Sequence, residues 1–153
     1  MTPSARQAAT FGDGLPSREV MQMASPELAL PHPKGSPVLE FKDLAPSITR
    51  QRLVVEGYPT FVITDEHIKE YLQKLSVVTD MITLIEPVTH ISDLYGWAGW
   101  IHWETSGAHF YSWERPIQFF SVDIYTCKAF DPEAVIEFTR EYFRTTEIVA
   151  KEF

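Results

Sequence analysis

The sequence predicts an α+β fold: a two-layer α/β sandwich in which a mainly antiparallel sheet is covered on one face by two helices. Two observations lead to this prediction. Between residues 81 and 125 several β-rich runs follow one another without an amphipathic helix between them. Two amphipathic helical patterns flank these runs, one near residues 65–77 and one that begins at Asp131 and Pro132.

The first unit of the predicted domain is a strand followed by a helix. Residues 52–58, RLVVEGY, are predicted to form the strand. Thr64 or Asp65 can cap a helix that runs to about Val77. Its apolar side chains recur at helical spacing and fall on one face: Ile68, Tyr71, Leu72 and Leu75.

The rest of the sheet is predicted from four runs. These are residues 81–88, residues 97–103, a short strand over 110–113 and a long one over 117–125. Asp131 then precedes a second helix with Pro132 in its first turn, where proline is favoured. The apolar side of that helix is predicted to consist of Val135, Phe138, Tyr142 and Phe143.

Aromatic residues are unusually frequent in the predicted strands. We expect the sheet face away from the helices to carry five of them, which is more apolar bulk than a solvated face normally exposes. The sequence therefore predicts that part of this face is a homodimer contact. The five residues are Trp97, Trp100, Trp103, Phe119 and Phe120.

Composition indicates one globular domain with an extension. Residues 1–47 hold seven of the 11 prolines and little apolar periodicity, so they are predicted to be a poorly ordered Pro-rich N-terminal extension to a domain over 48–153. The net charge of −8 argues against a nucleic-acid surface and suits a cationic small molecule. No apolar run reaches the roughly 20 residues of a membrane span, and we expect a cytoplasmic protein.

The most informative stretch runs from His90 to Pro132. It places Ser106 in a Thr-Ser-Gly turn between two aromatic-rich strands, and the only cysteine, Cys127, ends a later strand. Such a turn is commonly just a hairpin connection, and a cysteine after an apolar strand is commonly buried filler. Both residue types are also nucleophiles or proton donors when they are exposed.

The spacing of this stretch resembles the bacterial S-adenosylmethionine decarboxylase proenzyme family. The resemblance covers roughly residues 50–145 and includes the segment VDIYTC at 122–127. Three positions depart from the family pattern: Thr105, Gly107 and Tyr111 stand where the family usually has Glu, His and His. The other residues that carry the resemblance are His90, Gly96, Gly99, Ser106, Trp113, Asp131 and Pro132.

The resemblance implies a pyruvoyl-dependent decarboxylase that cleaves itself between Thr105 and Ser106. The cofactor would be a pyruvoyl group derived from Ser106, which forms a Schiff base with the substrate amine. By the same resemblance, Cys127 would be the proton donor, in a homodimer that supplies the aminopropyl donor for spermidine synthesis. Strand alternation puts His109 and Tyr111 on the same side, and either could be the processing base. The residues expected to bind the substrate, S-adenosylmethionine, are Glu56, His90 and Trp113.

Other interpretations remain open from the sequence. The substrate could be another cationic amino acid such as ornithine or arginine, or an uncleaved chain could act as a ligand-binding or partner subunit. His102 and Glu104, with His90 and His109 near them, could also hold zinc or iron, since these are N and O ligands. That signal is weak, and we expect no metal site.

Overall fold

The computed structural model describes residues 42–153, within which Asp43–Phe153 form one compact unit. Residues 1–41, which make up most of the predicted extension, lie outside the described residues. The chain order is β1 (Gln51–Tyr58), α1 (Asp65–Val78), β2 (Thr83–Ser92), β3 (Gly96–Trp103), β4 (Ser106–Trp113), β5 (Phe119–Thr126), α2 (Pro132–Phe143) and β6 (Glu147–Glu152).

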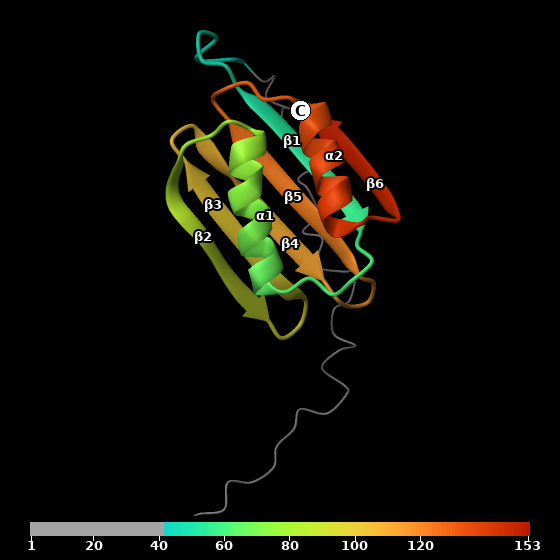
Figure 1. Ribbon diagram of the computed structural model, residues 1–153. Coiled ribbons are helices and arrows are strands. Elements are labelled where there is room, and N and C mark those ends of the chain that lie inside the picture. The colour runs from blue at the N-terminus through green and yellow to red at the C-terminus, as the bar shows by residue number, and fades with distance from the viewer. Residues whose placement is uncertain (1–41) are drawn as a thin grey trace, which may run out of the picture. The chain divides into compact units, whose positions relative to one another are not determined.

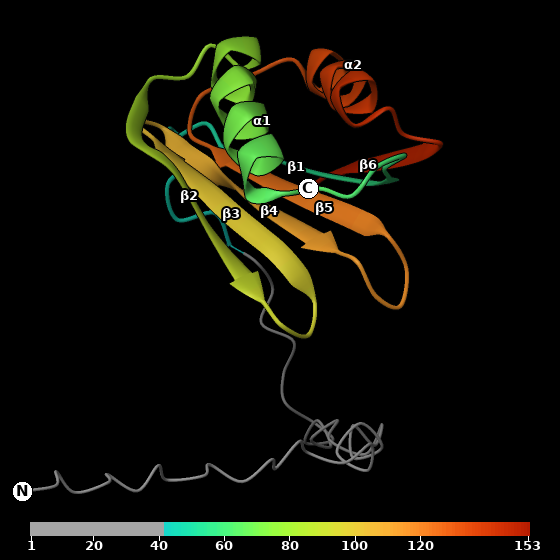
Figure 2. The same ribbon diagram turned by 60° about the horizontal axis from the view of Figure 1, so that its bottom comes forward.

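The strands form a six-stranded sheet in the order β2-β3-β4-β5-β1-β6, and every neighbouring pair is antiparallel. Both helices lie on the same side of this sheet (Figures 1 and 2). Helix α1 packs on β2 and β3, whereas α2 packs on β1 and β6. The predicted two-layer α+β sandwich is therefore confirmed.

The core lies between the helices and one face of the sheet. Tyr71 of α1 is fully buried, and its ring stacks on Phe138 of α2 with the centroids 5.3 Å apart. Phe143 at the end of α2 contacts Phe110 and Phe120 of the sheet, at centroid distances of 5.2 and 4.8 Å. Aromatic contacts thus join both helices to the two central strands.

Side chains that point away from the helices form what we call the open face of the sheet. No helix of residues 42–153 covers it (Figure 2). The expected set of five aromatic residues on this face is wrong for three of them. Trp103 and Phe120 are fully buried under the helices, and Trp97 packs against the same core. Only Trp100 and Phe119 alternate onto the open face, because successive strand residues point to opposite sides.

Three strands differ from the sequence prediction by several residues or were missed. Strand β2 extends to Ser92 rather than ending at residue 88. Strand β4 begins at Ser106 rather than at residue 110, because residues 106–109 pair with both β3 and β5. Strand β6, Glu147–Glu152, was not predicted at all. Its residues are mostly exposed and charged, and it is placed by pairing with β1 rather than by an apolar pattern of its own.

Candidate active site

Ser106 is the first residue of β4 and follows a two-residue turn. Trp103 at the end of β3 pairs with Ser106, so Glu104 and Thr105 alone connect the two strands. Ser106 has φ = 122°, a backbone conformation that residues with a side chain rarely adopt. Such a conformation costs about 1–3 kcal/mol and persists only where the surrounding structure imposes it.

Gly107 follows the strained residue but is not strained itself, because the positive φ belongs to Ser106. A Cβ on Gly107 would instead overlap the backbone carbonyl oxygen of Ile101 on β3. Gly107 is therefore required because the two backbones of the hairpin approach closely.

Cys127 lies directly beside this turn. Ser106 pairs with Thr126, the last residue of β5, so the next residue, Cys127, reaches the Thr105–Ser106 peptide. The Cys127 Sγ is 3.6 Å from the Ser106 Oγ, and the cysteine is exposed. The backbone N–H of Cys127 donates to the carbonyl oxygen of Thr105, with an N···O distance of 2.9 Å. The carbonyl before Ser106 is thus already polarised by a hydrogen-bond donor.

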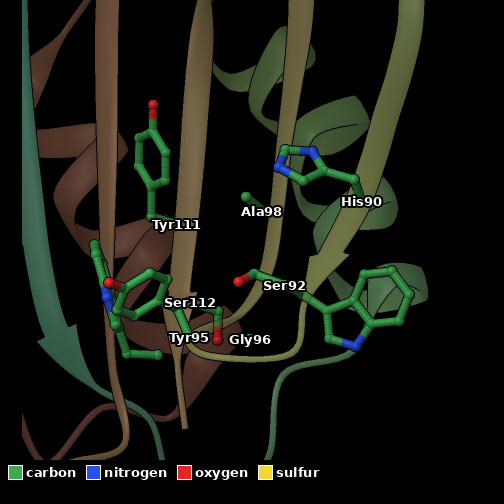
Figure 3. A pocket seen from close by; sticks show the side chains of 9 residues that line it. His90, Ser92, Tyr95, Gly96, Ala98, Tyr111 and Ser112 are labelled. Carbon is green, nitrogen blue, oxygen red and sulfur yellow. The ribbon is translucent and has the colours of Figure 1, made fainter. Parts of the chain in front are cut away.

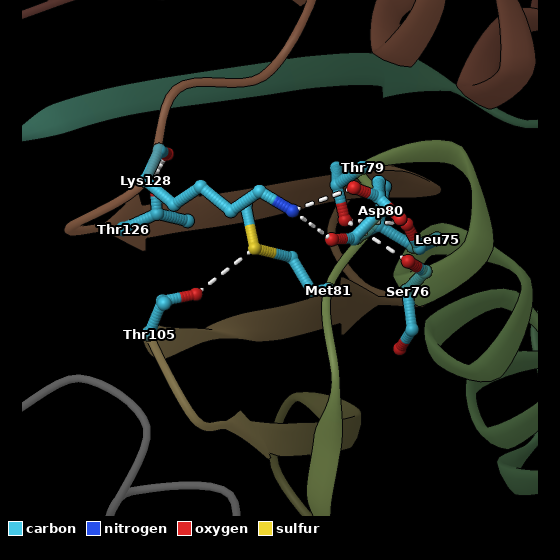
Figure 4. Close-up of polar contacts among 8 residues, drawn as sticks. All are labelled: Leu75, Ser76, Thr79, Asp80, Met81, Thr105, Thr126 and Lys128. Atoms are coloured by element: carbon cyan, nitrogen blue, oxygen red, sulfur yellow. Dashed lines mark hydrogen bonds and ion pairs between the residues drawn. The ribbon is translucent and has the colours of Figure 1, made fainter.

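A second group of contacts holds Thr105 and the segment after Cys127 (Figure 4). The Thr105 hydroxyl donates to the Sδ of Met81 at 2.9 Å. Lys128 donates from its Nζ to the carboxylate and the carbonyl of Asp80, at 2.6 and 2.5 Å. The hydrogen bond from Lys128 lowers the pKa of the Asp80 carboxyl below its usual value. Sequence reasoning missed Met81, Asp80 and Lys128, and no motif marks them.

The remaining predicted site residues lie on the open face. Tyr111 stands opposite Ala98 on one side and Ser121 on the other. His90 pairs with the same Ala98, and Glu56 pairs with the same Ser121. His90, Tyr111 and Glu56 therefore share one row across five strands of the sheet.

His109 lies in the next row of the open face. It stands between Trp100 of β3 and Asp123 of β5. Arg52 of β1 donates to both carboxylate oxygens of Asp123, at 2.9 and 2.7 Å. That hydrogen bonding raises the pKa of the Arg52 guanidinium above its usual value. The acid nearest to His109 in the register is thus already paired with a cation.

A pocket of about 320 Å³ lies where the β2–β3 hairpin meets the end of β4 (Figure 3). Three of the predicted site residues line it: His90, Tyr111 and Trp113. Its walls are mainly aromatic, which suits a flat ring such as a purine. The remaining lining residues are Ser92, Tyr95, Gly96, Trp97, Ala98 and Ser112.

The structure divides the predicted site residues between two places. Ser106 and Cys127 are in contact at one end of β4. His109 and Tyr111 are three and five residues further along this strand, or about 10 and 17 Å at roughly 3.3 Å per residue. Trp113 is further still. Within one chain, the pocket and the Ser106–Cys127 pair are therefore too far apart to hold one compact ligand jointly.

Residues 42–153 contain no group of three or more His, Cys, Asp or Glu side chains arranged to hold a metal ion. His102 is on β3, whereas Glu104 lies in the turn after that strand. Among the helices of these residues, none has the length and apolar character needed to cross a membrane.

The strain at Ser106 leads to a prediction for two variants that lack the hydroxyl. Ser106→Gly should be more stable than Ser106→Ala by about 1 kcal/mol, because glycine adopts positive φ without a Cβ penalty. Urea unfolding of the two variants, both as intact chains, measures the difference. A higher urea midpoint for the alanine variant would contradict the strained conformation.

Comparison with known proteins agrees with this fold. The crystal structure of the adenosylmethionine decarboxylase from Aquifex aeolicus matches with a TM-score of 0.58 and 15% sequence identity, covering 69% of this chain and 89% of that chain. At this identity the match supports the fold alone. The search of curated proteins gives no match. A family model of S-adenosylmethionine decarboxylase matches residues 52–153, which is more than half of the chain. The protein therefore belongs to the S-adenosylmethionine decarboxylase family.

Proposed function

We propose that this protein is a pyruvoyl-dependent decarboxylase of S-adenosylmethionine that matures by cleaving itself between Thr105 and Ser106. One observation carries the proposal. The Ser106 hydroxyl lies in a strained turn next to a carbonyl that already accepts a hydrogen bond from the Cys127 backbone N–H. This arrangement provides a nucleophile, its target and a donor for the developing negative charge.

Self-cleavage would proceed by an acyl shift and an elimination. The Ser106 Oγ attacks the Thr105 carbonyl carbon, the C–N bond breaks, and the hydroxyl proton passes to the released amino group. Loss of the Ser106 Cα proton then expels Thr105 as a carboxylate. Hydrolysis of the dehydroalanine at position 106 releases ammonia and leaves the ketone. The Cys127 N–H stays on the Thr105 oxygen throughout, so it stabilises the charge of the tetrahedral intermediate.

The chain's own residues fit a pyruvoyl group at position 106. Ser106 is the first residue of β4, so after cleavage it would become a free chain start while β4 stays paired with β5. The ketone would supply an electron sink when CO₂ leaves the substrate. Cys127, exposed and 3.6 Å from the Ser106 Oγ, is positioned to return a proton to the α-carbon.

The substrate is proposed from the charge and shape of the open face. Glu56 offers a partly buried carboxylate for the cationic substrate, and the mainly aromatic pocket offers flat surfaces for its purine. His90 and Trp113, which line this pocket, are proposed substrate contacts. The product of S-adenosylmethionine decarboxylation is an aminopropyl donor, and by family membership we propose a role in spermidine synthesis.

A homodimer would complete the site. Because the pocket and Ser106 lie at opposite ends of β4, a two-fold axis through the open face would place the pocket of one protomer near Ser106 of the other. This pairing would also bring the partner's copy of His109 or Tyr111 to the processing turn. Trp100 and the exposed Tyr111 supply apolar surface for such a contact.

The replaced family positions favour a second candidate function. Thr105 stands where the family usually has an acid, and its hydroxyl is engaged by Met81 rather than by Ser106. If these changes prevent cleavage, the intact chain acts as a ligand-binding or partner subunit. If cleavage occurs but the pocket excludes a purine, the substrate is a simpler cationic amino acid such as ornithine or arginine.

The first prediction of this proposal concerns chain cleavage. Purified protein should give two masses under denaturing conditions, corresponding to residues 1–105 and 106–153 with a pyruvoyl group at position 106. Ser106→Ala should give one intact mass, because it lacks the attacking hydroxyl. A single wild-type mass after long incubation would rule out the pyruvoyl assignment and leave the fold unaffected.

The second prediction concerns turnover. The protein should release CO₂ from S-adenosylmethionine. Borohydride added with substrate should abolish the activity, because it reduces the pyruvoyl group at position 106. Cys127→Ala should still cleave, because the donor to the Thr105 carbonyl is a backbone N–H that the substitution retains. Its turnover should fall by about 10²–10⁴-fold, the usual effect of losing one proton-transfer group.

Two results would revise this second prediction. Release of CO₂ from ornithine or arginine but not from S-adenosylmethionine would show that the substrate is wrong while the chemistry stands. Near-normal turnover of Cys127→Ala would show that the thiol takes no part in the reaction.

The third prediction concerns the open face. Trp100→Glu should dissociate the dimer and lower activity together, because a buried contact of at least about 1,000 Å² does not tolerate an unpaired charge. The control is Val77→Glu, since Val77 is 81% exposed and lies on the helical side. Sedimentation of both variants and of the wild type gives the oligomeric states. A wild-type monomer at micromolar concentration would contradict the dimer.

A further inference from the structure

Four residues from two other segments make contacts with Thr105 or with one another beside the peptide that precedes Ser106. Thr105 accepts a hydrogen bond from the Cys127 N–H and donates its hydroxyl to the Met81 Sδ, each at 2.9 Å. Lys128, the residue after Cys127, binds Asp80, the residue before Met81. Together with the hydrogen bond from the Cys127 N–H, the Thr105–Met81 and Lys128–Asp80 contacts drawn in Figure 4 close a ring that passes through Thr105.

Lys128 is the only cation in this ring, and its backbone is fixed. The buried Thr126 donates its hydroxyl to the Lys128 carbonyl at 2.5 Å. The ion pair itself is exposed, because the Asp80 side chain is 94% accessible and the Lys128 side chain 45%. Exposed pairs of this kind contribute at most about 1 kcal/mol. The Lys128 ammonium can therefore exchange one carboxylate for another at little cost.

Self-cleavage would create such a second carboxylate. The Thr105 carbonyl is neutral in the intact chain, whereas after cleavage Thr105 ends its fragment with a negative charge. This new group would keep the oxygen that accepts from the Cys127 N–H, whereas the contact with Met81 is made by the Thr105 hydroxyl. Its oxygen is held by the residue adjacent to Lys128, so the flexible lysine side chain needs only to turn back over its own backbone.

We propose that, after cleavage, the Lys128 ammonium group leaves the Asp80 carboxylate and pairs with the new Thr105 carboxylate. This ion pair helps to hold the two fragments together. This inference rests on the proposed self-cleavage and assigns Lys128 as a positioning residue of the mature protein. The pair formed in this way joins residues of different fragments, Thr105 of the first and Lys128 of the second. Before cleavage, Lys128 instead provides the cation that the last turn of α1 lacks.

The test compares Lys128→Met before and after cleavage. In the Ser106→Ala background, which stays intact, the substitution removes only an exposed pair, and the melting temperature should fall by less than about 4 °C. In the cleaved protein it removes a charge-assisted contact between fragments, and the fall should be at least about twice as large. At low ionic strength, where the ion pair is not screened, the cleaved variant should also lose its smaller fragment during gel filtration more readily than the wild type.

Two matched variants show which carboxylate pairs with Lys128. Asp80→Asn should lower the melting temperature slightly in the intact background and leave the cleaved protein unchanged, because Lys128 is then already engaged by Thr105. Lys128→Arg should restore fragment retention, since it keeps the positive charge.

Three outcomes decide the inference. Equal effects of Lys128→Met in the two backgrounds would overturn it, because Asp80 would then be the only partner. Equal effects of Asp80→Asn and Lys128→Met in the cleaved protein would overturn it for the same reason. A wild-type chain that never cleaves would overturn the proposed function itself, and that result is visible by mass before any variant is compared.

Discussion

The hydrogen bond from the Cys127 N–H to the Thr105 carbonyl is the contact on which the candidate active site depends. It ties the two-residue turn between β3 and β4 to the end of β5, so three strand ends meet at one peptide bond. The same contact brings the Cys127 thiol beside the Ser106 hydroxyl. The turn held in this way includes the positive φ of Ser106, which a loosely held turn would relax.

The core provides the rigidity that this contact needs. Trp103, directly before the turn, is fully buried and donates its indole N–H to the Ser76 hydroxyl of α1 at 2.8 Å. Thr126, directly before Cys127, is fully buried as well. The chain is therefore anchored three residues before Ser106 and one residue before Cys127. Buried residues directly before exposed reactive groups hold those groups in a fixed position.

Two groups of predicted site residues lie at opposite ends of β4. The Ser106 end carries groups suited to covalent chemistry, and the Trp113 end carries the mainly aromatic pocket. Both helices are on the opposite side of the sheet, so no helix of residues 42–153 covers the open face between these ends, where the proposed second copy of the chain would bind. The proposed two-fold pairing follows from this separation, because a symmetric contact joins unlike ends of two identical strands.

Hydrophobic periodicity alone was sufficient for both helices and for most strands, because each buries a continuous apolar stripe. It was insufficient for β6, whose polar residues are held by pairing with β1, and for residues 106–109, which have small or polar side chains. It also placed the neighbouring residues Phe119 and Phe120 on one face, although strand alternation separates them. The motif singled out Ser106 and Cys127, whose side chains are 3.6 Å apart in the structure, and their roles remain a prediction.

The sequence by itself therefore determined both helices and most strands, and it singled out the residues proposed to carry the chemistry, since these follow from local periodicity and from spacing along the chain. Only the tertiary structure decided which sheet face is open, how far Tyr111 lies from Ser106, and that Met81, Asp80 and Lys128 surround Thr105. Met81 and Lys128 are each more than 20 residues from Thr105 in the chain. Contacts of that kind arise from strand pairing and helix packing, which no local pattern encodes.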